Sequence, residues 1–423
     1  MTHAFRSLGS YNYRLWAGGA IVSNVGTWMQ RTAQDWLVLT QLTHNNATDL
    51  GIVMALQFGP QVLLLPITGY TVDRLDTRKI LIATQSSMGA LALGLGLLTV
   101  TGLVQIWHVY VFAFLLGCVG AFDSPARQVF VSELVGQEHL SNAVGLNSTS
   151  FNSARMLGPA IAGILIAVVG TGWLFLINAV SFLAVLSSLC LMRVHELHRS
   201  DHPAPNRSGL LEGFGYVWRR PEHRAVLLML FLIGTFGVNF PIFISTMSVR
   251  VFHKGAGEFG LLTSMMAVGS VSGAFLAARR AKSRIGVLIV GATLFGAGLG
   301  LGALMPDYWL FGLTLALVGV AAQTFTTSST SLLQLSTDPA MRGRVMASML
   351  AIALGGTPIG APIVGWVADR FGPRWALCVG AAAGFSAALV GLSYLVRYRG
   401  LSARWEDGRI RFALAERPVE KPI

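Results

Sequence analysis

The chain has 423 residues, of which 53% are hydrophobic and only 12% are charged, and its mean hydropathy is +0.61. Soluble proteins carry roughly 25% charged residues, so this composition excludes a protein whose whole surface faces water. The three cysteines, Cys118, Cys190 and Cys378, are far apart and odd in number, which excludes a disulfide framework and a cysteine metal site. The composition predicts an all-α membrane protein.

Apolar stretches of about 20 residues, the length needed to cross a hydrocarbon core of about 30 Å, recur along the whole chain. The sequence predicts twelve transmembrane helices, at residues 15–39, 50–68, 80–100, 106–122, 143–169, 173–192, 225–247, 259–278, 285–305, 309–333, 345–368 and 375–396. The first stretch is too long for a signal peptide and shows no small-residue cleavage pattern, so we expect it to be a retained span.

The basic residues are distributed unevenly between the predicted loops. With the N-terminus placed in the cytoplasm, the cytoplasmic segments hold 25 of the 31 Lys and Arg residues and the outer loops hold 4. This asymmetry follows the positive-inside rule and predicts that both termini are cytoplasmic. The net charge of +12 then reflects topology and attraction to anionic lipid head groups, and it does not indicate a nucleic-acid partner.

The sequence is internally duplicated. A shift of 202 residues places Gly163 and Trp173 on Gly365 and Trp375 without a gap. Two six-helix halves related by an axis along the membrane normal are a known way to build alternating access, with the substrate at mid-membrane between them. The predicted units are an N-terminal six-helix bundle (1–192), a cytoplasmic linker (193–222), a C-terminal six-helix bundle (223–396) and a cytoplasmic tail (397–423).

The linker changes character along its length. Residues 195–208 are polar, whereas apolar residues recur afterwards at helical spacing beside two arginines, namely Leu210, Leu211, Phe214, Val217, Trp218, Arg219 and Arg220. This pattern predicts a short amphipathic helix on the inner membrane surface.

Two charged turns with the pattern Gly-x-x-x-Asp-Arg interrupt the apolar runs. The first, residues 69–79, contains Gly69, Asp73, Arg74, Arg78 and Lys79. Its glycine allows close helix approach, and its aspartate can pair with arginine or lie near the positive end of a helix. The second turn, residues 365–372, lies between the last two predicted spans on the outer side. Its Asp369 and Arg370 are expected to form either a local ion pair or an outer-side latch.

Small residues recur along the predicted span at 143–169. They are Gly145, Ala154, Gly158, Pro159 and Gly163. Such residues give a helix a flat face that allows close packing, and proline allows a kink. Plain helix packing would also use small residues at these positions, although a functional helix is the favoured interpretation.

These motifs resemble those of the major facilitator superfamily. The first turn is similar to the cytoplasmic signature between the second and third spans of that family, and the small residues are similar to its antiporter motif. The resemblance implies that Asp73 and Arg74 act as a gate latch stabilising the outward-open state, and that substrate leaves in exchange for protons. Asp76 and Thr77 depart from the pattern, which prefers glycine and a basic residue at those positions.

Further segments are similar to one bacterial branch of the superfamily, which includes enterobactin-type siderophore exporters and macrolide efflux proteins. They are residues 122–128, Asn142, Ala143, 154–159, 26–30 and 36–38, and the resemblance covers residues 5–400. It implies a multi-pass protein of the bacterial cytoplasmic (plasma) membrane. The substrate stays open between a siderophore, a macrolide, another antibiotic and a metabolite.

Two charges lie close together in the first predicted span. A charge at mid-bilayer costs about 2.5–3.5 kcal/mol on insertion scales, so each one suggests a function. Arg31 and Asp35 are four residues apart and share a helical face, which Asn24 and Trp28 continue. Asp35 is a candidate proton carrier, because protonation would exchange a paired carboxylate for a neutral group. A static ion pair with Arg31 near the outer interface is the alternative.

Arg155 lies near the middle of the span at 143–169 and cannot release its proton at cellular pH. It is expected to contact an anionic substrate group or to clamp two spans together. Polar amides mixed with aromatic residues suit a large amphipathic ligand, although single amides also bridge helices by hydrogen bonds. The amide candidates are Gln30, Gln34, Gln57, Gln61, Asn152, Asn239 and Gln323.

Together these features predict a monomeric secondary active transporter, most simply a proton-coupled exporter (antiporter) of a small amphipathic molecule. No phosphate-binding Gly-x4-Gly-Lys-Ser/Thr loop occurs, so the proton gradient is the expected driving force, without cofactor or metal. An importer of a small metabolite in the same fold is the main alternative. An intramembrane enzyme is disfavoured because the nine histidines are scattered mainly through loops and ends, and no catalytic residue is assigned.

Overall fold

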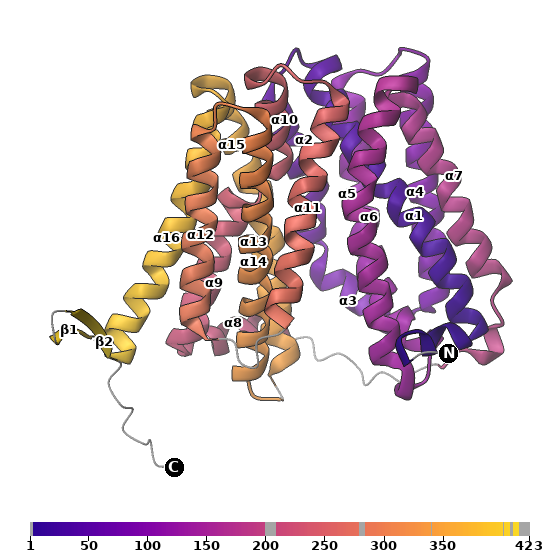
Figure 1. Ribbon diagram of the computed structural model, residues 1–423. Helices are drawn as coiled ribbons and strands as arrows, with labels where there is room; N and C mark the ends of the chain where they lie inside the picture. The colour runs from indigo at the N-terminus through magenta and orange to yellow at the C-terminus, as the bar shows by residue number, and fades with distance from the viewer. Residues whose placement is uncertain are drawn as a thin grey trace.

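Long helices run between two opposite ends of the molecule (Figure 1). The structure, a computed structural model, describes residues 3–198, 209–278, 284–339, 341–400, 402–406 and 409–413. Helices of the N-terminal half (residues 3–198) stand beside those of the C-terminal half (residues 209–400). The N-terminal turn, helix α8 and the C-terminal strands lie at the same end, here called the α8 end.

The N-terminal half consists of helices and short turns. They are η1 (His3–Gly9), α1 (Tyr11–Trp36), η2 (Leu37–Leu42), α2 (Ala47–Leu63), α3 (Leu65–Arg74), α4 (Thr77–Val100), α5 (Ile106–Leu134), η3 (Gln137–His139), α6 (Leu140–Val169), α7 (Thr171–Leu191) and η4 (Val194–Glu196). The side chains of Ser10, Asn46 and Asp76 accept backbone N–H bonds at the starts of α1, α2 and α4. These caps satisfy amides that have no partner inside the helix, which fixes where each helix begins.

The C-terminal half is also helical. Its elements are α8 (Gly209–Arg219), α9 (Pro221–Leu232), η5 (Ile233–Gly237), α10 (Phe240–Thr246), η6 (Met247–Val251), α11 (Ala256–Ala278), α12 (Ile285–Leu304), α13 (Tyr308–Ser336), α14 (Arg342–Gly355), α15 (Thr357–Phe371) and α16 (Pro373–Arg399). Proline lies in the first turn of α9, α15 and α16, where a missing N–H leaves no bond unmade. Beyond α16, β1 (Ser402–Glu406) pairs antiparallel with β2 (Arg409–Ala413), within the segment predicted as a tail.

Ten helical segments among the described residues are long and apolar enough to cross a membrane. They match the ten predicted stretches from residue 80 onward, with α9 to η6 counted as one segment and α14 with α15 as another. The first two predicted stretches are absent from this set. α1 is long but carries a polar stripe, and α2 has only 17 residues before the helix ends at Leu63. The count of twelve therefore stays a prediction.

One predicted boundary is wrong. The apolar stretch at 106–122 was expected to end before Asp123, but α5 continues to Leu134. The reason is that Asp123 is buried within the helix and has its own partners. Its carboxylate accepts hydrogen bonds from Thr84 and Gln85 of α4 and pairs with Arg127 at 2.6 Å. Because these partners compensate the buried charge of Asp123, the helix can continue through this position.

The two halves meet along two helix pairs. α2 packs on α15, and α6 packs on α11. Glycine allows both approaches, since a Cβ added to Gly365 would lie 2.9 Å from the Cα of Thr48, and one added to Gly163 would lie 3.0 Å from the Cα of Gly257. The small residues predicted to give α6 a flat face therefore lie partly against α11.

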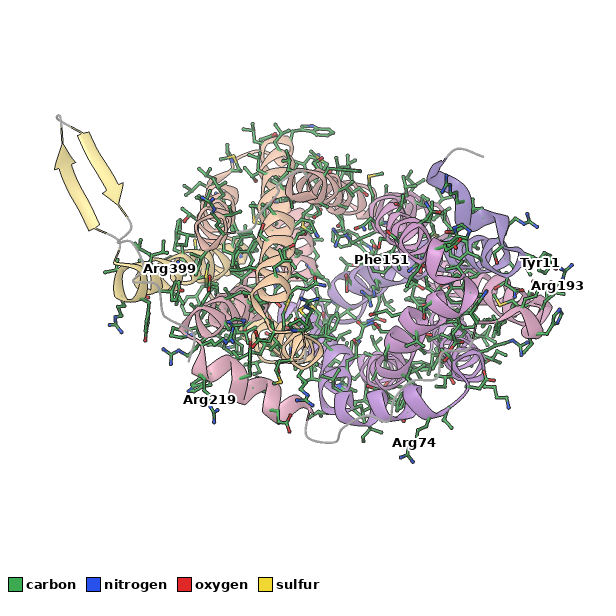
Figure 2. The ribbon with its side chains drawn as sticks, turned by 90° about the horizontal axis from the view of Figure 1, so that it is seen from below. Tyr11, Arg74, Phe151, Arg193, Arg219 and Arg399 are labelled. Atoms are coloured by element: carbon green, nitrogen blue, oxygen red, sulfur yellow. The ribbon has the colours of Figure 1, made fainter. Side chains whose placement is uncertain are left out.

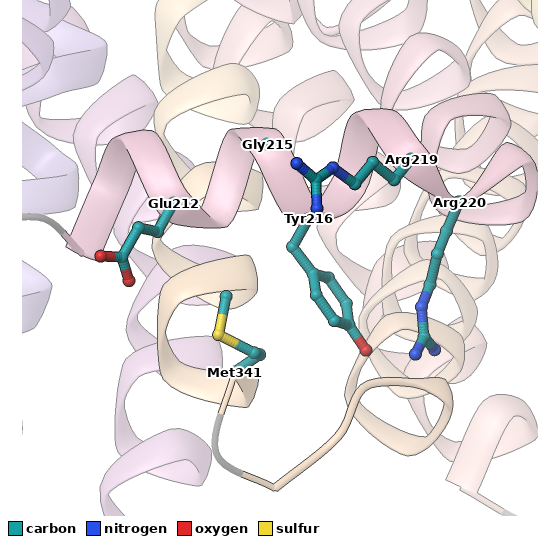
Figure 3. A pocket seen from close by; sticks show the side chains of 6 residues that line it. All are labelled: Glu212, Gly215, Tyr216, Arg219, Arg220 and Met341. Carbon is teal, nitrogen blue, oxygen red and sulfur yellow. The ribbon is translucent and has the colours of Figure 1, made fainter. Parts of the chain in front are cut away.

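The amphipathic linker helix exists as α8 and is tied to the segment before and at the start of α14 (Figure 3). The Tyr216 hydroxyl donates to the Asp338 carboxylate at 2.7 Å, and Arg220 pairs with the same carboxylate at 2.9 Å. Glu212 pairs with Arg344 at 2.5 Å. Burial raises the pKa of Tyr216, so its phenol keeps the proton that it donates. These contacts enclose a surface hollow of about 460 Å³, which Met341 also lines.

Candidate functional site

The polar stripe of α1 faces α6. The Asn24 amide lies 3.5 Å from the Ser150 hydroxyl, and the Trp28 ring meets the Phe151 ring edge-on at 5.8 Å. Phe151 is 46% exposed although it belongs to a membrane-crossing helix. Seen from the α8 end, it lies between the two halves (Figure 2). This face of α1 and α6 is hereafter called the α1–α6 wall.

Arg155 lies on the same helix as Phe151, one turn further from the α8 end. Its Nε atom is buried and has no hydrogen-bond partner among the described residues. Gly158, three residues further on, packs against Trp28 of α1. Arg155 is therefore level with Trp28, and a buried guanidinium without a complete set of acceptors favours an anionic ligand.

Arg31 lies one turn beyond Trp28 on α1. Its guanidinium lies 5.1 Å from the centre of the Trp28 ring and 6.0 Å from that of the Phe58 ring of α2. The described structure shows no hydrogen bond between Arg31 and Asp35 and no contact between their charged atoms within 4.0 Å, although the two charges attract each other electrostatically. Arg31 makes cation–π contacts with the two rings, and the roles of Arg31 and Asp35 stay predictions.

The predicted amide candidates do not gather at one place. The Gln30 side chain accepts from Asn178 of α7 at 2.6 Å, and the Asn239 amide donates to Thr235 in a fully buried position. Gln61, Asn152 and Gln323 bond to neighbours one turn away on their own helices. Gln34 and Gln57 are buried. Gln30 thus bridges helices, whereas Asn152 shares the face of Ser148 and Arg155.

The small residues of α6 have different surroundings. Ala154 is fully buried, Gly158 packs on α1, and the carbonyl of Pro159 lies against Gly260 of α11. Gly145 is exposed, with nothing near the position of a Cβ. The middle of the motif is therefore a packing surface for two helices, one from each half.

In the first charged turn, two described side chains bond within the N-terminal half. Asp76 caps α4 by accepting from the Lys79 amide at 3.2 Å, which explains an aspartate at that position. Arg78 donates from Nε to the Leu189 carbonyl at 2.8 Å. Gly69, Arg74 and Lys79 are exposed. The Asp73 side chain lies outside the described residues.

In the second charged turn, Asp369 joins the two halves. Its carboxylate accepts from the backbone amides of Ala47 and Thr48 at 2.9 and 2.8 Å, and from the Thr48 hydroxyl at 2.6 Å. It also pairs with Arg250 at 2.7 Å, while Arg250 donates to the carbonyls of Asn45 and Ala368. We call this group the Asp369 latch. Of the two expected arrangements, the local pair with Arg370 is not the one formed.

The Asp369 latch was only partly visible in the sequence. The pattern Gly-x-x-x-Asp-Arg drew attention to Asp369, but its partners are two backbone amides and an arginine 119 residues away. The one available signal was Asn46-Ala47-Thr48, a helix start in a loop on the same side of the predicted membrane. A carboxylate at a helix N-terminus is also favoured by the helix dipole.

Among the described residues, no group of three or more His, Cys, Asp or Glu side chains is placed to hold a metal ion. The α1–α6 wall and its neighbours on α1 and α2 present two guanidinium groups, one carboxylate and aromatic rings.

Comparison with solved structures supports the fold. The chain aligns with a bacterial homologue of the human lysosomal transporter Spinster, solved in an inward-facing and unoccupied conformation, with a TM-score of 0.70. The alignment covers 92% of this chain and 94% of the other at 15% sequence identity, so the likeness concerns the fold alone.

Comparison with curated proteins finds transporters. The staphyloferrin A transporter of Staphylococcus aureus is 27% identical over 352 residues, which are 82% of this chain and 87% of the relative. The enterobactin exporter EntS of Shigella boydii is 25% identical over 372 residues, which are 85% of each chain.

A family model described as transmembrane secretion effector matches residues 4–417, which is nearly the whole chain. Members of this family and the relatives above are transporters and not enzymes. The chain thus belongs to the transmembrane secretion effector family of the major facilitator superfamily, and it is a multi-pass membrane transporter.

Proposed function

We propose that the protein is a secondary active exporter that moves a small amphipathic molecule, such as a siderophore, out of the bacterial cytoplasm in exchange for protons. The relatives named for staphyloferrin A and enterobactin support the substrate class. The observation that carries the proposal is the α1–α6 wall. It combines Phe151, which is exposed between the two halves, with the incompletely bonded Arg155 one turn further along α6.

We propose twelve spans in two six-helix bundles, residues 1–192 and 223–396. The polar stripe lowers the hydropathy of α1 because that helix lines the transport path, and α2 continues through α3 to complete the second span. The α8 end is then cytoplasmic in the inner membrane, with both termini inside, and the opposite end is the outer one. Each monomer contains a complete path of its own.

We propose that the structure represents the inward-facing state. The Asp369 latch and the close α2–α15 approach lie at the outer end, where they hold the two halves together. Alternating access requires this outer contact to break when the path opens outward. In that state Asp73 and Arg74 of the first turn form the inner latch.

Asp35 is the proposed proton carrier. It is the one carboxylate of α1, and it lies one turn from Arg31 on the stripe of the α1–α6 wall. Protonation neutralises the carboxylate and weakens its attraction to Arg31. The protonated and deprotonated forms of the transporter therefore differ by one charge in this region. The gradient is coupled to transport through that difference.

Direction and coupling are tested with everted membrane vesicles from cells that overproduce the protein. Respiring everted vesicles given enterobactin or staphyloferrin A should accumulate one of them, and a protonophore should abolish the accumulation. Accumulation of neither compound in everted vesicles, together with gradient-driven uptake into right-side-out vesicles, would identify an importer.

Two variants assign roles within that assay. Asp35→Asn should abolish gradient-driven accumulation while leaving exchange of labelled for unlabelled substrate measurable. Arg155→Gln should reduce both at least tenfold, because an ion-paired ligand group loses about 1.5–3 kcal/mol without its charged partner. Full gradient-driven transport by Asp35→Asn would exclude Asp35 as the carrier.

A further inference from the structure

A second cavity lies away from the α1–α6 wall, at the α8 end of the C-terminal half. It is a groove of about 440 Å³ between α8, α9 and α16. Its wall includes Trp218, Arg224, Leu228, Phe231, Arg397 and Tyr398. None of the residues lining it carries a carboxylate. It therefore offers positive charge and apolar surface together.

The two arginines occupy equivalent positions on neighbouring helices. Arg224 lies seven residues before Phe231 on α9, and Arg397 lies seven residues after Val390 on α16. At 1.5 Å per residue, each arginine lies about 10 Å along its helix from an apolar residue that also lines the groove, and the arginine is the one nearer the α8 end. A single leaflet of hydrocarbon is about 15 Å deep, so the groove extends from the membrane surface well into one leaflet.

Neither arginine has a carboxylate partner in the described structure. The Arg224 guanidinium donates to the Tyr398 hydroxyl at 3.2 Å, and Arg397 is exposed. The nearby Glu222 is turned to Arg399 at 3.8 Å. Two cations therefore remain at the mouth of the groove, where a phosphate group would complete their bonding.

The opening of the groove is bordered by exposed apolar side chains. Trp218 is 70% exposed and Leu228 is 45% exposed. Tryptophan is favoured at the level of lipid head groups, and α8 and the end of α16, whose last residues are Arg219 and Arg399, lie at the same end of the molecule (Figure 1). An amphipathic helix at the inner surface is expected at this depth.

We propose that this groove binds one anionic phospholipid, with the phosphate between Arg224 and Arg397 and an acyl chain along Leu228 and Phe231. The lipid joins the linker helix α8 to α9 and α16 of the C-terminal half. The site is separate from the transport path, so it stands whether the protein exports or imports its substrate.

Native mass spectrometry of the delipidated full-length protein tests the proposal. Equal amounts of dioleoylphosphatidylglycerol and dioleoylphosphatidylcholine are offered in neutral detergent. The wild type should retain one phosphatidylglycerol in preference to phosphatidylcholine. Arg224→Gln with Arg397→Gln should lower this preference at least fivefold, whereas Arg224→Lys with Arg397→Lys should keep most of it. A matched control, Arg14→Gln with Lys79→Gln, removes two exposed basic residues of the N-terminal half and should change nothing.

The position of the acyl chain is tested separately, by fluorescence. Phosphatidylglycerol with brominated acyl chains should quench a component of the tryptophan emission that is absent from Trp218→Phe. An unchanged lipid preference in the double glutamine variant would overturn the proposal, as would an equal loss in the control. Folding of each variant is checked by its elution as a single species in size-exclusion chromatography.

Discussion

The two charged turns share the pattern Gly-x-x-x-Asp-Arg, yet their contacts differ. In the first turn, Asp76 caps α4 and Arg78 binds the end of α7, so both of these contacts lie within the N-terminal half. In the second turn, Asp369 binds the first turn of α2 and so joins the two halves. Both copies of the pattern lie at the end of a helix, and the aspartate of the second copy also joins the two halves.

The contacts of Asp369 follow from what surrounds it. Asp369 faces the amides at the start of α2, and Arg250 supplies a cation from its own half. A carboxylate that accepts several hydrogen bonds, one of them from a guanidinium, is held firmly. In the transport cycle proposed above, this contact is made in the inward-facing state and broken in the outward-facing state.

The largest expected effect comes from Asp369→Asn. The amide can accept from one backbone N–H but cannot pair with Arg250, and each charged hydrogen bond contributes about 1.5–3 kcal/mol. Hydrogen exchange of the amides at 47–50 should therefore accelerate at least tenfold, measured by mass spectrometry of the matching peptide. Unaltered exchange there would show that Asp369 does not hold α2.

A smaller effect is expected from Arg250→Gln, for which Arg370→Gln is the matched control. Arg250 bonds to Asp369 and to two carbonyls, whereas Arg370 is exposed. The same amides should exchange about fivefold faster in the first variant, since one charged bond is lost while the amide bonds to Asp369 remain. A larger effect of Arg370→Gln than of Arg250→Gln would show that Arg370, and not Arg250, is the partner of Asp369.

A still smaller effect is expected from Thr48→Val, which removes the hydroxyl bond to Asp369 and keeps the backbone amide. The backbone amides of Ala47 and Thr48 keep their own bonds to Asp369, so exchange should rise only about twofold to threefold. Thr43→Val removes a hydroxyl that bonds within its own loop and should leave the 47–50 amides unchanged. Equal effects from the two variants would mean that loop rigidity, and not Asp369, protects α2.

No effect at the outer end is expected from Asp76→Ala in the first turn. Loss of an N-cap costs about 1 kcal/mol, which should appear as a lower melting temperature. Exchange of the 47–50 amides should match the wild type, because the start of α4 that Asp76 caps lies at the α8 end, opposite to the start of α2 (Figure 1). Faster outer exchange in this variant would couple the two turns directly.

The sequence predicted much of the fold, because apolar length and loop charge both report on a membrane protein. It identified the stretches that became α4 to α7 and α9 to α16, and the helix α8. The predicted end of α5 was wrong because a charged residue after an apolar stretch usually indicates a loop. The sequence does not show that Asp123 has hydrogen-bond partners on α4. The α1 stripe that suggested a transport path also lowers the hydropathy of that helix.

The candidate site was harder to predict. Helical spacing found Arg31 and Asp35 on one face, but it could not show that Arg31 would lie over Trp28 and Phe58. The partners of Asp369 lie far away in sequence. Two of them are backbone amides, which nearly every residue has, so the residue type does not reveal them. Contacts of this kind become visible only when the two halves are placed together.

The most direct test of the outer latch is a distance across the outer end. Spin labels are placed at Leu103 and Pro306, both exposed and on opposite halves, in a chain whose three cysteines are replaced by serine. Pulsed electron spin resonance without substrate should give a single distance in the otherwise unaltered chain and an added longer one in Asp369→Asn. Identical distance distributions in the two proteins would contradict the claim that Asp369 holds the outer side closed.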